Sequence, residues 1–204
     1  MKNLTLGLLL LLFVGAPNAF AEPITLTFNE LTPRVAHGVS FAGVTFGFTL
    51  NGAASADATY NNTESGNSRY IRGSALEGNA SGTLTLNFTQ ATSLLSFGLA
   101  LSSFNDLSPG FTVRLFDASL NAIGTYNVTT TSTLSFTEGF FQYAGTAVAR
   151  AVITFNPLLT GGRFAFDNLT VNAIPEPATL LLLGSGLAGI ASLARRRKQT
   201  KQRD

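Results

Sequence analysis

Side chains that could catalyse a reaction are few in this sequence. His37 is the only histidine, and there is no cysteine. These counts exclude thiol catalysis, cysteine-ligated metal sites and metal sites built from a cluster of histidines. No Gly-x-Ser-x-Gly segment accompanies the histidine, the Gly-Ser-Gly at 184–186 lies inside the C-terminal apolar run, and the acidic residues stand singly rather than in a glycosidase-like constellation. We therefore expect no enzyme activity, and a hydrolase is the less favoured alternative.

One polar segment gathers side chains that could contact a ligand. Residues 51–82 are rich in Gly, Ser and Asn, and they contain Tyr60, Arg69, Tyr70 and Arg72. Long polar connections in compact domains are often functional. We take the four residues as candidates for ligand binding. The alternative is a solvated loop with one edge strand around Tyr70.

The elements that must position these residues are β-strands. Apolar and polar residues alternate with a period of two in many short stretches rich in Thr, Phe and Val, and no internal segment keeps a helical period. Residues 117–121 predict a hairpin connection. The pattern predicts an antiparallel β-sandwich, most simply a jelly roll. The expected strands are 24–31, 44–50, 83–88, 95–102, 111–117, 122–128, 132–138, 148–155 and 163–171.

The charge of the chain is unevenly distributed. Between residues 22 and 174 there are six arginines, nine acidic residues and no lysine. Six of the 13 basic residues of the chain follow Ala194. A mildly acidic domain lacks the basic surface that nucleic acid requires. We therefore expect no nucleic-acid partner.

The N-terminus has the features of a secretory signal peptide. Lys2 precedes an apolar run over residues 4–14, and small residues stand at Ala19 and Ala21. This run is too short to span a bilayer, and the small-x-small ending favours cleavage. We predict cleavage after Ala21, with the secretion machinery and signal peptidase as partners.

The C-terminus combines an apolar run with a basic cluster. Residues 178–194 carry no charge and have about the minimum length for a transmembrane helix. Pro175 and Pro177 disfavour helix before this run. The basic residues that follow it predict a stop-transfer signal with its C-terminal end in the cytoplasm. These residues are Arg195, Arg196, Arg197 and Lys198.

The sequence PEPATLLLLGSGLAGIASLARRR, residues 175–197, closely resembles the PEP-CTERM protein-sorting signal of Gram-negative bacteria. The resemblance implies that Pro175, Glu176 and Pro177 are read by exosortase, a membrane-embedded enzyme similar to cysteine transpeptidases. It further implies cutting near this motif and delivery to the cell surface or the exopolysaccharide matrix. The alternative is a plain type I membrane protein that keeps its tail.

The stretches ITLTFNEL, GVSFAGVTFGF and FAFDNLTV resemble the domain common in PEP-CTERM proteins and are similar to galactose-binding-like jelly rolls. That resemblance implies a structural calcium ion, the one cofactor we consider. Glu30 and Asp167 are the candidate ligands, because the first and last strands of a jelly roll are commonly neighbours. Calcium takes six to eight oxygens, so Asn29 and Asn168 would have to help. The alternative is that Asp167 and Asn168 bind backbone groups.

Together these features predict three regions: a signal peptide (1–21), an extracellular β-sandwich (22–172) and a sorting signal (173–204). We expect an exported surface or matrix protein that passes through the inner membrane by way of 178–194. Its sandwich is expected to bind carbohydrate, with exopolysaccharide as the candidate partner. A structural coat protein without a ligand is the main alternative.

Overall fold

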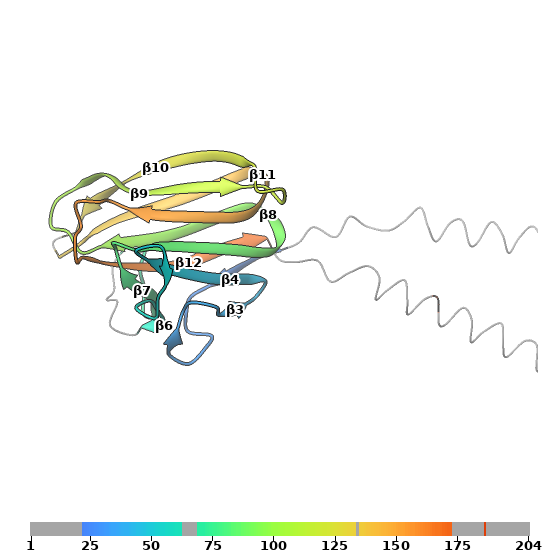
Figure 1. Cartoon of the computed structure of the whole chain (residues 1–204), viewed down its shortest axis with the longest axis horizontal. Helices are drawn as coiled ribbons and strands as arrows, with labels where there is room; N and C mark the ends of the chain where they lie inside the picture. The colour runs from blue at the N-terminus through green and yellow to red at the C-terminus, as the bar shows by residue number, and fades with distance from the viewer. Residues whose placement is uncertain (1–21, 63–68, 134, 173–185, 187–204) are drawn as a thin grey trace, which may run out of the picture. The chain divides into compact units, whose positions relative to one another are not determined.

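The computed structural model describes residues 22–62, 69–133, 135–172 and 186. Residues 22–173 form one compact unit, shown in Figure 1. All strand pairings in the described part are antiparallel. The strands are β1 (Pro23–Leu26), β2 (Arg34–Val35), β3 (Ser40–Phe41), β4 (Val44–Leu50), β5 (Ala53–Ala54), β6 (Thr59–Asn62), β7 (Ala75–Asn79), β8 (Thr83–Leu101), β9 (Leu107–Phe116), β10 (Ala122–Ser132), β11 (Thr137–Phe155) and β12 (Arg163–Asn172).

Two long strands organise the fold. β8 and β11 have 19 residues each and pair with one another, with register shifts between Ala144 and Arg150. The first part of β8 also pairs with β4, and its last part pairs with β12. One layer therefore runs β10-β9-β11-β8-β4, and the other runs β11-β8-β12-β7-β6-β2. Because both long strands belong to both layers, all twelve strands form one continuous hydrogen-bonded network.

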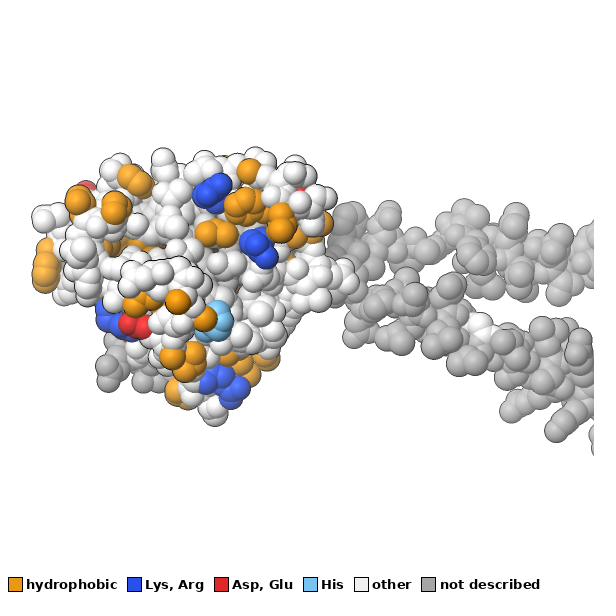
Figure 2. Space-filling model, in the orientation of Figure 1, with side chains coloured by type: hydrophobic (Ala, Val, Ile, Leu, Met, Phe, Trp, Pro, Cys, Tyr) orange, Lys and Arg blue, Asp and Glu red, His pale blue; other side chains and the backbone are white. Residues whose placement is uncertain are grey.

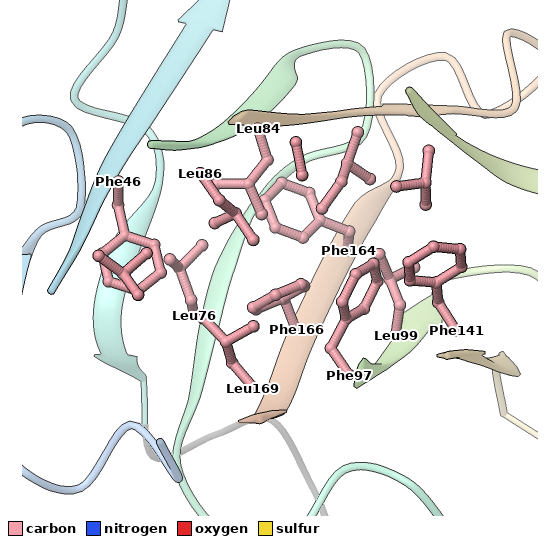
Figure 3. Close-up of a cluster of buried hydrophobic side chains, with 14 of the residues drawn as sticks. Phe46, Leu76, Leu84, Leu86, Phe97, Leu99, Phe141, Phe164, Phe166 and Leu169 are labelled. Atoms are coloured by element: carbon pink, nitrogen blue, oxygen red, sulfur yellow. The ribbon is translucent and has the colours of Figure 1, made fainter. Parts of the chain in front are cut away.

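The two layers pack face to face through aromatic and aliphatic side chains. Phe48 on β4 contacts Phe164 on β12, with ring centroids 5.8 Å apart. Phe28 contacts both Phe46 and Phe166 at 5.7 Å. Figure 3 shows residues of this cluster pointing toward one another between the strands. The alternation seen in the sequence thus directs one set of side chains into a single core.

The antiparallel β-sandwich predicted from the sequence is confirmed, as is the hairpin at residues 117–121, which joins β9 to β10. The expected adjacency of the first and last strands is also confirmed, because β1 pairs with β12. The finer assignment as a galactose-binding-like jelly roll stays a prediction. The signal peptide and the segment 178–194 lie outside the described residues, apart from Gly186.

Several predicted strand bounds were wrong. Residues 83–88 and 95–102 belong to one strand, β8, and the first strand ends at Leu26, since Phe28 has a φ of 60°. The predicted strand 132–138 is instead the end of β10, a short connection and the start of β11. The segment 51–82 is not a long loop, because it contains β5, β6 and β7. Among the described residues, no helix is long and apolar enough to cross a membrane.

Candidate functional site

A short segment, residues 69–73, crosses the outer face of the layer formed by β11, β8 and β12. We call this segment the strap. Phe140 of β11, Gly98 of β8 and Asp167 of β12 stand side by side in register beneath it. A Cβ atom at Gly98 would lie 2.6 Å from the carbonyl oxygen of Tyr70. The strap can therefore lie this close to the sheet only because residue 98 has no side chain.

Apolar contacts hold the middle of the strap against the sheet. Ile71 is fully buried, and it belongs to a small cluster separate from the main core. The other buried members are Ala75, Ala100 and Ala165, with Phe136 packed against them. These small alanine side chains allow the strap to approach the strands, so the outer face of the layer carries a second small core.

Two carboxylates bind the two ends of the strap. Glu138 Oε2 accepts hydrogen bonds from the backbone N–H groups of Arg69 (3.1 Å) and Tyr70 (3.2 Å). Asp167 Oδ2 accepts one from the N–H of Arg72 (2.8 Å). Asn168 Nδ2 donates to the carbonyl oxygen of Tyr70 (3.0 Å). The position of the Tyr70 side chain therefore depends on residues far away in the sequence.

The strap forms one wall of a shallow cavity of about 460 Å³. The Tyr70 ring stacks on Phe140, with centroids 5.4 Å apart and an interplanar angle of 26°. The Arg69 guanidinium lies over the Tyr70 ring at 5.0 Å. Phe140 is 43% exposed. Hydroxyl-bearing residues at the end of β10 and just beyond it line the cavity as well, namely Thr129, Thr131, Ser132 and Thr133. The hydroxyls of Ser132 and Thr133 donate to the carbonyl oxygens of Phe104 and Phe136, so toward a ligand they act as acceptors.

The carboxyl groups beside the strap ionise less readily than usual. Burial raises the pKa of Glu138, and the N–H groups of Tyr70 and Arg69 offset this only in part. Burial likewise raises the pKa of Asp167 from 3.8 to about 6, and the nearby charge of Glu30 adds to the rise. Both groups are almost inaccessible to solvent, which disfavours the charged form.

The four candidate ligand residues have different environments. Arg69 and Tyr70 line the cavity, whereas Arg72 is exposed and outside the set of lining residues. Tyr60 is fully buried in the main core, so its assignment to a ligand surface is corrected. Its hydroxyl donates to Glu30 Oε2 at 2.9 Å, and burial raises the pKa of Tyr60.

Sequence reasoning missed Glu138 and Phe140, which lie almost 70 residues beyond the strap. Phe140 occupies a strand position whose neighbours Gly139 and Phe141 are buried, so alternation alone predicts that it faces outward. This predicted exposure of an aromatic side chain on a strand was the one sequence signal that could have marked Phe140 as a candidate ligand contact. No sequence signal predicted that Tyr70 would stack on it, because that contact depends on where the strap crosses the sheet.

The geometry at Glu30 and Asp167 does not fit an oxygen-ligated calcium ion. Glu30 Oε1 accepts from the N–H of Thr27 (2.6 Å), and both Asp167 oxygens accept from N–H groups, including that of Asn168 (2.6 Å). Asn168 presents its Nδ2 rather than an oxygen to Asp167. No three His, Asp or Glu side chains within the described ranges are grouped to hold a metal. Calcium binding stays a prediction that these contacts do not support.

His37 lies in an exposed turn, where its Nδ1 accepts a hydrogen bond from the Phe48 N–H at 3.0 Å. This bond gives the side chain a structural role in the turn. The face shown in Figure 2 carries its basic side chains at separate points rather than in one patch. That face therefore offers no continuous basic surface to a polyanion.

Comparison with known families identifies the C-terminal segment. Residues 173–198 match the family model described as PEP-CTERM protein-sorting motif. The chain therefore carries a PEP-CTERM sorting motif, which implies export and membrane-anchored sorting with exosortase as the processing partner. Pro175–Pro177 and the basic residues 195–198 fall within this match but outside the described residues. Ala19 and Ala21 also lie outside the described residues.

The sandwich itself is similar to carbohydrate-binding modules of known structure. A family 29 carbohydrate binding module has a TM-score of 0.38 and 9% identity, covering 78% of this chain and 98% of the module. The CBM22-1 xylan-binding domain from Paenibacillus barcinonensis Xyn10C has a TM-score of 0.41 and 10% identity, covering 77% of this chain and 97% of that domain. The CBM22-1-GH10 modules of Clostridium thermocellum Xyn10B have a TM-score of 0.40 and 16% identity, covering 76% of this chain and 29% of the matched chain. Similarity this distant says nothing of this chain's ligand. No curated protein matches the sequence.

Proposed function

We propose that this chain is an exported protein, sorted through its PEP-CTERM motif, whose sandwich binds carbohydrate at the cavity beside the strap. The site supports binding rather than catalysis, because the carboxyl group at the cavity is held by backbone amides and no histidine lies there. In this proposal exosortase cuts near Pro175–Pro177. The sandwich then acts at the cell surface or in an exopolysaccharide matrix.

The observation that carries the binding proposal is the aromatic pair next to a row of hydroxyl groups. Sugar rings present C–H faces that pack on aromatic side chains, and their hydroxyl groups exchange hydrogen bonds with Thr and Ser. Phe140 and Tyr70 supply the first kind of surface, and the end of β10 supplies the second. The volume of about 460 Å³ lies in the range of small-molecule sites.

The binding proposal is tested with full-length protein in detergent and the exopolysaccharide of the producing cells, by co-sedimentation. We expect Phe140→Ala to lower the affinity about tenfold, since a contact worth about 1.4 kcal/mol corresponds to that factor. Phe104→Ala is the matched control, because Phe104 is 74% exposed and outside the cavity. Equal binding by wild type and Phe140→Ala would contradict the proposal.

The sorting proposal is tested by intact mass of the protein from the membrane fraction and from the medium. We expect a species that begins at Glu22 and ends near Pro175–Pro177. A mature protein that still carries residues 178–204 would instead make this a plain membrane-anchored protein.

A further inference from the structure

Glu138 is the cavity residue whose hydrogen-bonding capacity is only half used. The residue is 4% exposed, and its Oε2 accepts from two strap amides. Its Oε1 has less than 1 Å² of exposed surface and no hydrogen-bond partner among the described residues. A buried acceptor without a partner costs about 1–3 kcal/mol, and more when it is charged. Such a cost in a native structure calls for an explanation.

The location of this oxygen indicates what could satisfy it. Glu138 lines the cavity together with Tyr70 and Phe140. The two amide bonds to Oε2 fix the plane of the carboxyl group, so Oε1 keeps one direction. Arg69 lines the same cavity, is exposed and makes no ion pair in the described part of the chain. Because Oε1 is covered in this structure, a ligand reaches it only when a side chain of the cavity wall such as Arg69 moves. A donor in the cavity would then reach a preoriented acceptor.

Three other buried oxygens without partners among the described residues do not offer the same opportunity: Asn61 Oδ1, Thr130 Oγ1 and Thr137 Oγ1. Thr130 and Thr137 are fully buried, and a Cβ at Gly110 would lie 2.3 Å from Thr130 Oγ1. None of the three residues lines the cavity. Glu138 is therefore distinguished by its place in the cavity wall as well as by its free acceptor.

We infer that Glu138 selects the ligand: its Oε1 accepts a hydrogen bond from a hydroxyl group of an uncharged sugar. This inference rests on the proposed carbohydrate binding and names the ligand class of the same site. Hydrogen bonds to a charged acceptor are about twice as strong as neutral ones, so the contact discriminates strongly between sugars. A sugar carboxylate at the same position is rejected, because it would bring a second negative charge to a buried one.

The inference predicts how affinity depends on pH. The groups nearest Glu138 are the strap residues Arg69, Tyr70 and Ile71, with Thr131 of β10 and Ala100 of β8 opposite it in register. Of these only Arg69 is charged, and the nearest acidic group on the β10 side is Asp106, which accepts from the N–H of Ser132. A hydroxyl donor binds the ionised carboxylate and lowers its pKa, so affinity falls when the pH drops and Glu138 becomes protonated. Burial already raises the pKa of Glu138 above its usual value, which brings this loss nearer to neutral pH.

The test compares full-length wild type and Glu138→Gln in detergent, with neutral hexasaccharides of glucose, mannose and xylose and an oligogalacturonate of equal length as probes. In the variant, the amide oxygen keeps the strap bonds and the amide nitrogen replaces Oε1, so the free acceptor becomes a donor. We expect about a tenfold to hundredfold loss of affinity for the neutral probe that binds best, corresponding to a charged hydrogen bond. Asp117→Asn is the matched control, because Asp117 also accepts from two backbone amides but lies at the exposed β9–β10 turn.

The outcomes are distinguishable. Wild type that binds a neutral probe, loses affinity from about pH 8 to about pH 5 and rejects the oligogalacturonate supports the inference, provided that Glu138→Gln binds weakly and without this pH dependence. Equal affinity and an equal pH profile in Glu138→Gln would overturn the inference while leaving carbohydrate binding intact. Wild type that co-sediments with the exopolysaccharide of the producing cells but binds none of the neutral probes would overturn the inference alone. Failure to bind either the exopolysaccharide or any probe would overturn the proposed function and this inference with it.

Discussion

Replacing Gly98 with alanine tests whether the strap is held where the structure places it. The added Cβ would lie 2.6 Å from the Tyr70 carbonyl oxygen and 2.7 Å from the Tyr70 Cβ. Atoms of the strap backbone cannot rotate away as a flexible side chain could. Gly98 has no positive φ, so its own backbone accepts alanine without strain. The substitution therefore acts by pushing the strap off the sheet.

The size of the effect follows from the contacts at risk. The strap amides of Arg69, Tyr70 and Arg72 each contribute about 1 kcal/mol net through their bonds to carboxylates. Burial of Ile71 contributes about 1.5–3 kcal/mol. A strap that shifts without detaching loses only part of this total, as overpacked sites typically cost about 1–3 kcal/mol. We expect Gly98→Ala to lower the free energy of unfolding by about 2 kcal/mol.

The assay is urea unfolding followed by circular dichroism, since the chain has no tryptophan. Gly47→Ala is the matched control, because a Cβ there meets its nearest atom, Thr85 Cβ, at an ordinary 3.5 Å. We expect this control to change stability by less than about 0.5 kcal/mol. Hydrogen exchange of the strap amides should accelerate in Gly98→Ala alone. Equal stability of the two variants, with unchanged exchange at the strap, would refute the placement of the strap.

Three further predictions follow from buried groups. Folding raises the pKa of Asp167 from 3.8 to about 6, so its contribution is fully present below pH 3.8 and is lost as the pH rises through about 6. We therefore expect the free energy of unfolding to be about 1 kcal/mol greater at about pH 5 than at about pH 7, and urea titrations of Asp167→Asn should show a smaller difference. Tyr60→Phe should cost about 1 kcal/mol in thermal unfolding, by loss of the bond to Glu30, and leave carbohydrate affinity unchanged; weakened binding would return Tyr60 to the ligand surface. Phe166→Ala should cost about 3–5 kcal/mol in urea unfolding, because this fully buried ring packs on Phe28 and Phe97, and a loss below about 1 kcal/mol would contradict the core.

Alternation of apolar residues was enough to predict the β-sandwich, because burying one face of a strand constrains every second residue. Strand lengths were less predictable. Residues 89–91 of β8 are exposed, and the polar pair Thr89 and Gln90 suggested a break where the strand in fact continues from one layer to the other.

The candidate site was only partly predictable for a related reason. Arg69 and Tyr70 were found from the composition of their segment. Their partners Glu138 and Phe140 belong to β11, and only the path of the strap over Gly98 brings the two segments together. Tyr60 had the same composition signal as Tyr70, yet strand β6 places it in the core. Contacts of this kind depend on tertiary packing, which local patterns do not encode.

The most direct test of carbohydrate binding at the strap is hydroxyl-radical footprinting of the full-length protein with and without the exopolysaccharide of the producing cells. Aromatic side chains react readily with the radical, so their protection reports where the polysaccharide lies. We predict protection of Tyr70 and Phe140, with no change at Phe104 and Leu158, which are 74% and 81% exposed and outside the cavity. Protection of Phe104 or Leu158 without protection of Tyr70 and Phe140 would contradict this prediction.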